Sequence, residues 1–169
     1  MTAPRQAGWP ETSASLGRRV EASAVVGQGE AAWQRAAHDV LRWRVKTRSG
    51  FAVDRPGPVR AGDRLTITAR MLGITVREPV EVVAVVDTDA RVGFSYRTLP
   101  GHPVAGEEAF IVTRDRDNVT FTVRSLTRPA ERQPWRALYP VLRIAQVIAR
   151  RRYLRALSAN RPSTDEMEG

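Results

Sequence analysis

The sequence predicts an α+β fold in which a curved antiparallel sheet is covered by one long C-terminal helix. Between residues 63 and 126, apolar and polar residues alternate in short runs that are separated by turn residues. Such alternation is typical of antiparallel strands with one buried face. From about residue 140 the apolar spacing becomes helical and continues to about residue 158.

Composition is that of one ordinary domain. The chain has 169 residues, of which 42% are hydrophobic and 27% charged, enough to build a core. It has no cysteine, which excludes disulfides and thiolate chemistry and is typical of a reducing compartment. Residues 1–10 lack a secretory apolar segment, and no run is long enough to cross a membrane. We therefore expect a cytoplasmic protein with a loose arm over 1–15, one α+β domain over 16–158 and a polar tail over 159–169.

The first half of the predicted domain alternates strand and helix. Residues 18–26 have the alternation of a strand that Gly27 and Gly29 end. Residues 30–44 predict one amphipathic helix with Trp33, Ala36, Ala37, Val40 and Leu41 on its apolar side. Residues 51–62 contain two prolines and a glycine between them, which predicts a loop.

The rest of the sheet is predicted from five further strands, the last two of which form a hairpin. The alternating or apolar runs are 63–71, 80–86, 91–99, 107–114 and 118–126, the last two joined around Asp115-Arg116-Asp117. A turn sequence, Pro100-Gly101-His102-Pro103, separates the third run from the fourth.

The C-terminal helix completes this prediction. Pro140 suits a first helical turn, and Val141, Ile144, Ala145 and Ile148 form one stripe that we expect to face the sheet. About 19 residues at 1.5 Å each give roughly 28 Å, enough to cross a sheet. This order of elements is the helix-grip pattern, similar to START and polyketide-cyclase domains. Such folds often hold an apolar cavity between sheet and helix.

The net charge of +9 has a compositional explanation. Of the 27 basic residues only Lys46 is a lysine, which indicates the arginine bias of a GC-rich genome. The arginines are scattered except around Arg150-Arg151-Arg152, with Arg143 and Arg155 nearby. Nucleic-acid modules interleave aromatic residues with such a cluster, and here only Tyr153 does so. We interpret the cluster as a solvated helix face and expect no nucleic-acid partner.

One segment resembles a known family. Residues 93–110 are Gly-Phe-Ser-Tyr-Arg-Thr-Leu-Pro-Gly-His-Pro-Val-Ala-Gly-Glu-Glu-Ala-Phe. They resemble the pattern Gly-Phe-x-Tyr-Gly-Thr-Leu-Pro-Gly-His-Pro-x-x-Gly-Glu-Glu of domain of unknown function 1990, or uncharacterised protein family 0548, found in bacteria and plants. The resemblance extends over residues 16–158, through Gly29-Glu30 with Ala36, Leu41 and Trp43, then Arg128-Pro129-Ala130, Gln146 and Arg152-Tyr153-Leu154.

The chain departs from this family pattern at three places. Arg97 replaces the usual glycine, Val104-Ala105 replaces Glu-Ser, and Val80-Glu81 stands where Cys-Arg is common. A large cation at position 97 implies a different ligand if the strand passes close to one. The resemblance supports the fold and implies no activity.

Three residues are candidates for acid–base chemistry, namely His102, Glu107 and Glu108. A histidine and a carboxylate close to Tyr96 can move protons on a bound carbonyl compound. Consecutive strand residues point to opposite faces, so only one of the two glutamates can face a cavity. The alternative is structural: the histidine bonds the backbone of its turn, and a glutamate pairs with an arginine.

The candidate ligand-binding residues are the aromatic residues near this segment and the departing arginine: Trp33, Phe94, Tyr96, Arg97 and Phe110. Two distant histidines without spaced carboxylates predict no metal site. The sequence has no phosphate-binding loop, dinucleotide fingerprint or nucleophile elbow, so we expect no cofactor.

Three functions remain open. The first is a binding domain for an apolar or amphipathic small molecule, held between sheet and helix. The second is an enzyme of the polyketide cyclase or dehydratase type that uses His102 and a glutamate. The third is binding to an anionic surface or nucleic acid through the C-terminal arginines. The sequence leaves the oligomeric state open.

Overall fold

The protein folds into one seven-stranded antiparallel sheet that curls around its C-terminal helix. The computed structural model describes residues 1–9, 17–55, 57–71, 74–129 and 135–158. The strands are β1 (Arg18–Gln28), β2 (Phe51–Val53), β3 (Arg64–Met71), β4 (Ile74–Asp87), β5 (Arg91–Thr98), β6 (Val104–Asp115) and β7 (Asn118–Pro129). The helices are α1 (Gly29–Val40), α2 (Arg44–Thr47) and α3 (Trp135–Ala156).

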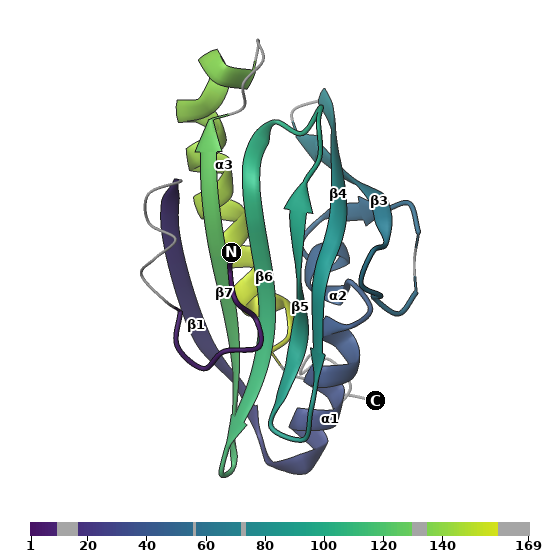
Figure 1. Ribbon diagram of the computed structural model, residues 1–169. Coiled ribbons are helices and arrows are strands. Elements are labelled where there is room, and N and C mark those ends of the chain that lie inside the picture. Colours follow the sequence, from purple (N-terminus) through teal and green to yellow (C-terminus); the bar gives the residue numbers. More distant parts are fainter. Residues whose placement is uncertain (10–16, 56, 72–73, 130–134, 159–169) are drawn as a thin grey trace, which may run out of the picture.

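The sheet order, β1-β7-β6-β5-β4-β3-β2, places the first strand beside the last. Figure 1 shows the helices on one face of this sheet, where α3 packs against β7, β1 and β6. The predicted helix-grip architecture is therefore confirmed. No helix in the described part of the chain combines the length and the apolar character needed to span a bilayer.

An aromatic cluster from neighbouring strands forms the centre of the core. Phe94 of β5, Phe110 of β6 and Phe121 of β7 are fully buried on the inner face. The ring centroids of Phe94 and Phe110 are 5.5 Å apart, and those of Phe110 and Phe121 6.2 Å. Because inward residues alternate with outward ones along each strand, the alternating sequence pattern places these three rings on the same face.

The predicted helix over 30–44 is instead two helices. The first ends at Val40 and the second begins at Arg44. Trp43 between them has a left-handed backbone, with φ of 60°. This turn places its indole in the core, 4.7 Å from Phe94 between ring centroids. Burial of a large aromatic side chain offsets the cost of a conformation that non-glycine residues rarely adopt.

Two strand boundaries also differ from the prediction. The predicted loop over 51–62 begins with a short strand, β2, which pairs with β3. Strand β4 starts at Ile74 and passes through Pro79, where the prediction placed its start near residue 80. The carbonyl of Pro79 still accepts a hydrogen bond from the backbone N–H of Leu99, at 2.9 Å. The proline therefore removes a donor without ending the strand.

The predicted inner stripe of α3 is correct in part: Ala145 and Ile148 line a cavity between α3 and the sheet, Ile144 does not, and the side chain of Val141 is outside the described residues. Ile144 and Ile148 are 65% and 47% exposed, whereas Tyr153 is buried. Leu157, just after the helix, is buried as well. Near its C-terminal end α3 therefore packs on the sheet through Tyr153, whereas Ile144 points away from the sheet.

The N-terminal residues lie on the other face of the sheet. The predicted loose arm of residues 1–15 is described over 1–9, and this part packs against β7; residues 10–15 are outside the described residues. The buried guanidinium of Arg124 donates to the backbone carbonyls of Thr2, Ala3, Gln6 and Ala7 and forms an ion pair with Glu21. A buried charge needs such partners, so the segment and Arg124 stabilise each other.

Candidate functional site

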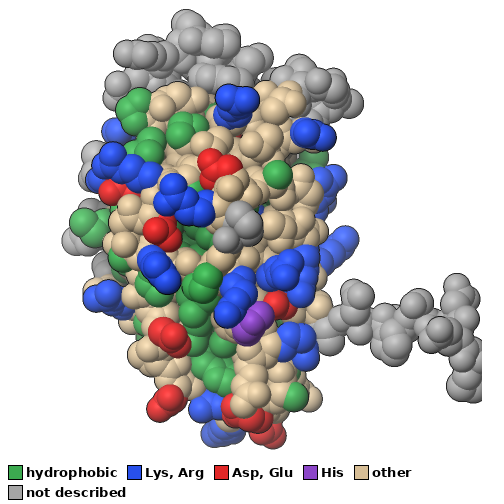
Figure 2. Space-filling view, turned by 90° about the vertical axis from the view of Figure 1, so that its right-hand side faces the viewer, with side chains coloured by type: hydrophobic (Ala, Val, Ile, Leu, Met, Phe, Trp, Pro, Cys, Tyr) green, Lys and Arg blue, Asp and Glu red, His purple; other side chains and the backbone are tan. Residues whose placement is uncertain are grey.

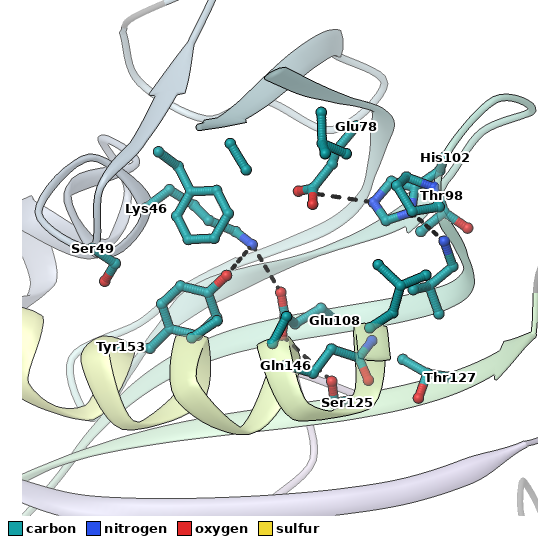
Figure 3. Close-up of a pocket in the computed structure, with 18 of the residues that line it drawn as sticks. Lys46, Ser49, Glu78, Thr98, His102, Glu108, Ser125, Thr127, Gln146 and Tyr153 are labelled. Carbon is teal, nitrogen blue, oxygen red and sulfur yellow. Dashed lines mark hydrogen bonds and ion pairs between the residues drawn. The ribbon is translucent and has the colours of Figure 1, made fainter. Parts of the chain in front are cut away.

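A cavity of about 410 Å³ lies between the inner face of the sheet and α3. Figure 3 shows side chains from α2, from the strands and from α3 converging on it. Its wall is partly apolar, with Phe51, Val76, Leu142, Ala145, Ile148 and Ala149 among the residues that line it. Its lining includes the ionisable residues Lys46, Arg70, Glu78, His102, Glu107, Glu108 and Arg152, and four of them, Lys46, Glu108, Glu78 and His102, form its two buried polar pairs.

Lys46, the only lysine of the chain, is the ammonium of the first pair. Its side chain is 3% exposed, and Nζ donates to Oε2 of Glu108 at 3.0 Å and to the hydroxyl of Tyr153 at 2.7 Å. Four aromatic rings surround it, with centroids 4.6–5.4 Å from Nζ, namely Phe51, Tyr96, Phe110 and Tyr153. At such distances the ring faces attract a cation, most strongly where water is excluded.

Glu108 of β6 is the counter-charge. Besides Lys46, it accepts hydrogen bonds from the hydroxyl of Tyr96 and, at 3.4 Å, from that of Ser125. Burial acts to raise the pKa of Glu108, but Lys46 and the Tyr96 hydroxyl outweigh it, and the pKa lies below its usual value. Glu108 is therefore a carboxylate at neutral pH, held by its partners.

Lys46 remains protonated for the same reason. Burial acts to lower the pKa of Lys46, but Glu108 and then the two tyrosines outweigh it, so the pKa lies well above its usual value. An ammonium has three N–H donors, and two of them bind Glu108 and Tyr153. The described residues offer no hydrogen-bond acceptor for the third, which leaves it for a ligand in the cavity.

His102 and Glu78 form a second polar pair. The distance from Nε2 of His102 to Oε2 of Glu78 is 4.0 Å. Burial and the charge of Lys46 lower the pKa of His102 to about 4, so its imidazole is neutral at pH 7. Burial raises the pKa of Glu78, and Lys46 counteracts this only in part. Unlike Lys46 and Glu108, these two groups do not form a direct hydrogen bond with each other.

Glycine at position 106 allows Glu108 to sit where it does. The φ of Gly106 is 156°, and a Cβ there would lie 2.0 Å from the carbonyl oxygen of Leu126. Only glycine therefore permits β6 to approach β7 at this point. The glycine precedes Glu107-Glu108 in the segment that carries the family resemblance.

The structure separates the two candidate glutamates as strand alternation requires. Glu108 joins the cluster in the cavity, whereas the carboxylate of Glu107 binds the backbone N–H and hydroxyl of Thr2. Glu107 still contributes to the cavity wall. His102 lines the cavity too, and its Nδ1 accepts a hydrogen bond from the backbone N–H of Val104 at 3.0 Å. The backbone bond of the structural alternative is therefore present as well.

Of the five candidate ligand-binding residues, only Tyr96 lines the cavity. Phe94 and Phe110 are packed inside the aromatic cluster. Trp33 of α1 is buried as well, and the guanidinium of Arg114 lies over its ring. Arg97 follows Tyr96 and points to the opposite face, where it forms an ion pair with Glu81. All four aromatic candidates are buried, but three of them belong to the core beside the cavity and do not line it.

Three residues of the two buried polar pairs and their hydrogen-bond partners were missed by the sequence analysis as site residues: Lys46, Glu78 and Tyr153. Their separation along the chain hides the cluster. The signal that was present is the retention of one lysine in a chain otherwise rich in arginine. Within the ranges described above, no group of three or more histidines and carboxylates is arranged to hold a metal ion.

Replacing Lys46 tests the charge pair. We expect Lys46→Met to lower the free energy of unfolding at pH 7 by about 3–5 kcal/mol, because Glu108 is left as an uncompensated buried charge. The double variant Lys46→Met/Glu108→Gln should recover most of this loss. Arg44→Met, which removes an exposed cation from α2, should change stability by no more than about 0.5 kcal/mol. Urea unfolding gives the free energy of unfolding of the wild type and the three variants. Equal losses of this free energy in Lys46→Met and Arg44→Met would contradict the assignment.

Replacing His102 tests its neutral state. The pKa of His102 falls from its usual 6.5 to about 4 on folding, so its contribution to stability is complete above pH 6.5 and is lost as the pH falls to about 4. This loss of unfolding free energy is at most about 3 kcal/mol. The raised pKa of Glu78 increases stability as the pH falls and therefore opposes the loss.

We therefore expect His102→Gln to flatten the fall in unfolding free energy between pH 7 and pH 4. His38→Gln is the matched control, because the His38 side chain is 57% exposed. A His102→Gln profile parallel to that of the wild type would show that His102 is not held neutral.

Comparisons with known proteins agree with this fold. The crystal structure of hypothetical protein jhp0584 from Helicobacter pylori superposes with a TM-score of 0.63 at 15% identity, covering 93% of this chain and 96% of that one. At this identity the likeness shows the fold alone.

Sequence comparisons give the family. A UPF0548 protein of Deinococcus radiodurans is 32% identical over 149 residues, which cover 78% of this chain and 72% of the relative. A UPF0548 protein of Arabidopsis thaliana is 28% identical over 116 residues, which cover 64% of this chain and 57% of the relative. The family model described as "Domain of unknown function (DUF1990)" matches residues 4–156. The chain therefore belongs to the DUF1990 family, as residues 93–110 predicted.

Proposed function

We propose that this protein is a binding domain for an amphipathic small molecule, held between the sheet and α3. The observation that carries the proposal is the cavity of about 410 Å³, which has the size of small-molecule sites. Apolar residues of α3 form one wall, and the third N–H of Lys46 offers a donor at the other. Because Glu108 neutralises Lys46, the cavity favours a ligand with a neutral polar end. The proposal includes a cytoplasmic location, which is supported by the absence of cysteine.

The alternative of a cyclase or dehydratase that uses His102 and a glutamate has less support. A general base needs a pKa near the working pH and a free lone pair. His102 has a pKa of about 4, and its Nδ1 already accepts a hydrogen bond. Glu108 has a lowered pKa and is bound by Lys46, Tyr96 and Ser125. The geometry therefore favours binding over proton transfer by this pair.

A second candidate function is attachment to an anionic lipid surface, and the exposed face of α3 supports it. Ile144, Val147 and Ile148 are 65%, 38% and 47% exposed. Arg151 and Arg155 continue this face at helical spacing and are exposed as well. On the side of the molecule in Figure 2, by contrast, basic side chains are spread among acidic ones. A helix with aliphatic and basic residues on one face suits the surface of an anionic bilayer.

Membrane attachment also suits the proposed ligand. Ile148 and Arg152 of α3 line the cavity, so the exposed helix face borders the binding site. An amphipathic ligand that partitions into a bilayer would then be close to the cavity. Exposed aliphatic side chains fit a lipid surface better than nucleic acid, which favours basic residues interleaved with aromatic ones.

Native mass spectrometry of the purified protein tests ligand binding. We expect a co-purifying small molecule with an apolar part and a neutral polar end. Ala145→Phe, which fills the cavity from α3, should abolish its binding, whereas Ala31→Phe on the exposed side of α1 should not. The proposal fails if the protein carries no ligand and takes up none of a panel of amphipathic compounds, or if both variants bind as the wild type does.

Vesicle sedimentation tests the lipid surface. We expect binding to phosphatidylcholine vesicles that contain phosphatidylglycerol and no binding without it. Arg151→Gln/Arg155→Gln should weaken this binding about tenfold or more, since each basic residue near an anionic surface contributes about 1 kcal/mol. Ile144→Ser/Ile148→Ser should weaken it too.

The matched control is Arg42→Gln/Arg44→Gln, which removes the same charge from exposed positions of another region. If this control weakens vesicle binding equally, the protein is attracted to the vesicles by its net charge only. Tight binding to duplex DNA that the isoleucine variant leaves unchanged would favour nucleic acid and contradict the lipid surface.

A further inference from the structure

Glu78 and His102 face each other in the cavity without a direct hydrogen bond. The distance of 4.0 Å between Oε2 of Glu78 and Nε2 of His102 exceeds hydrogen-bond length. The two side chains are only 18% and 10% exposed. Among the described residues, neither the Glu78 carboxylate nor His102 Nε2 has a hydrogen-bond partner, and Figure 3 shows both on the cavity wall.

The backbone determines which nitrogen of His102 carries the proton. Nδ1 accepts a hydrogen bond from the N–H of Val104, so Nδ1 has no proton. In a neutral imidazole the proton then lies on Nε2, which makes Nε2 a donor. The atom that faces Glu78 therefore has one hydrogen to give and no lone pair with which to accept.

The space between the two atoms fits one oxygen. An oxygen about 2.8 Å from each atom, an ordinary hydrogen-bond distance, is compatible with a separation of 4.0 Å. That oxygen must accept from Nε2 and donate to the carboxylate, as a hydroxyl group or a water molecule does. We propose that Glu78 and His102 form a subsite for a ligand hydroxyl, which donates to Glu78 and accepts from Nε2 of His102.

Other polar groups match the subsite less well. An ammonium has no lone pair for the N–H of His102, and a ketone has no proton for the carboxylate of Glu78. Burial raises the pKa of Glu78 and Lys46 opposes this rise, so a moderately alkaline solution keeps Glu78 ionised. The charged groups that act on Glu78 are Lys46 and Glu108, which neutralise each other.

The inference names the ligand class for the proposed binding function and rests on it. The ligand is a hydroxylated amphipathic molecule whose hydroxyl lies between β4 and the turn that precedes β6. Its apolar part lies against α3. A second acceptor group on the ligand can use the free N–H of Lys46.

A matched set of three probes tests the subsite. We would measure the affinity of 4-phenylcyclohexanol, 4-phenylcyclohexanone and phenylcyclohexane for the full-length protein by calorimetry at about pH 8, where Glu78 is ionised. We expect the alcohol to bind about tenfold or more tightly than the ketone, because a hydrogen bond to a charged acceptor is gained. Equal affinity, or preference for the ketone, would overturn the subsite. Binding of none of the three would count against the proposed function instead.

Substitutions locate the effect. Glu78→Met should reduce the affinity for the alcohol about 10- to 100-fold and leave that for the ketone nearly unchanged. Glu78→Gln keeps an acceptor of the same shape, so it should recover part of the loss and serves if the methionine variant does not fold. Glu81→Gln, on the same strand but paired with Arg97 outside the cavity, should bind both probes as the wild type does. Loss of alcohol binding in Glu81→Gln, or none in Glu78→Met, would overturn the assignment.

Discussion

The buried ammonium of Lys46 is the constraint on which the site depends. A charge in an interior is costly unless it is paired, and Lys46 is paired with a carboxylate of β6, a hydroxyl of α3 and surrounding aromatic rings. These partners come from α3 and from the strands β2, β5 and β6, so satisfying one charge of α2 fixes α2, the sheet and α3 relative to one another. The same ammonium opposes the effect of burial on Glu108 and keeps it ionised, whereas His102 is kept neutral by burial first and by the ammonium second.

The cavity lies where α3 presents small residues to the sheet. Tyr153 and Leu157 are buried against the core, whereas Ala145 and Ala149, earlier along the inner face, are too small to fill the space. The larger Ile144 is 65% exposed, and Ile148, which lines the cavity, is still 47% exposed. A helix held in this way leaves a volume with an apolar wall on one side and the charged cluster on the other. The same arrangement leaves aliphatic side chains exposed beside the arginines.

Alternation of apolar and polar residues was enough to predict the sheet, because strand faces repeat every two residues whatever the tertiary contacts. It also placed Glu107 and Glu108 on opposite faces. The sequence pattern could not predict the break at Trp43, where tertiary packing stabilises an unfavourable backbone. It also could not predict the exposure of Ile144, because helical spacing defines a stripe of residues without saying what covers it. The polar cluster was hidden because Lys46, Glu78 and Tyr153 meet only in three dimensions. The one available sign was a single lysine among arginines.

Two of the departures from the family pattern lie opposite each other in the sheet. Glu81 and Arg97 both depart, and they are cross-strand neighbours in β4 and β5, joined by an ion pair at 2.9 Å. Directly opposite residues of unlike charge stabilise a strand pair, so the two changes compensate each other on the face away from the cavity. Arg97 therefore gives no reason to expect an altered ligand in this chain. The residues of the proposed binding site are instead Lys46, Glu78 and His102, which line the cavity on the inner face.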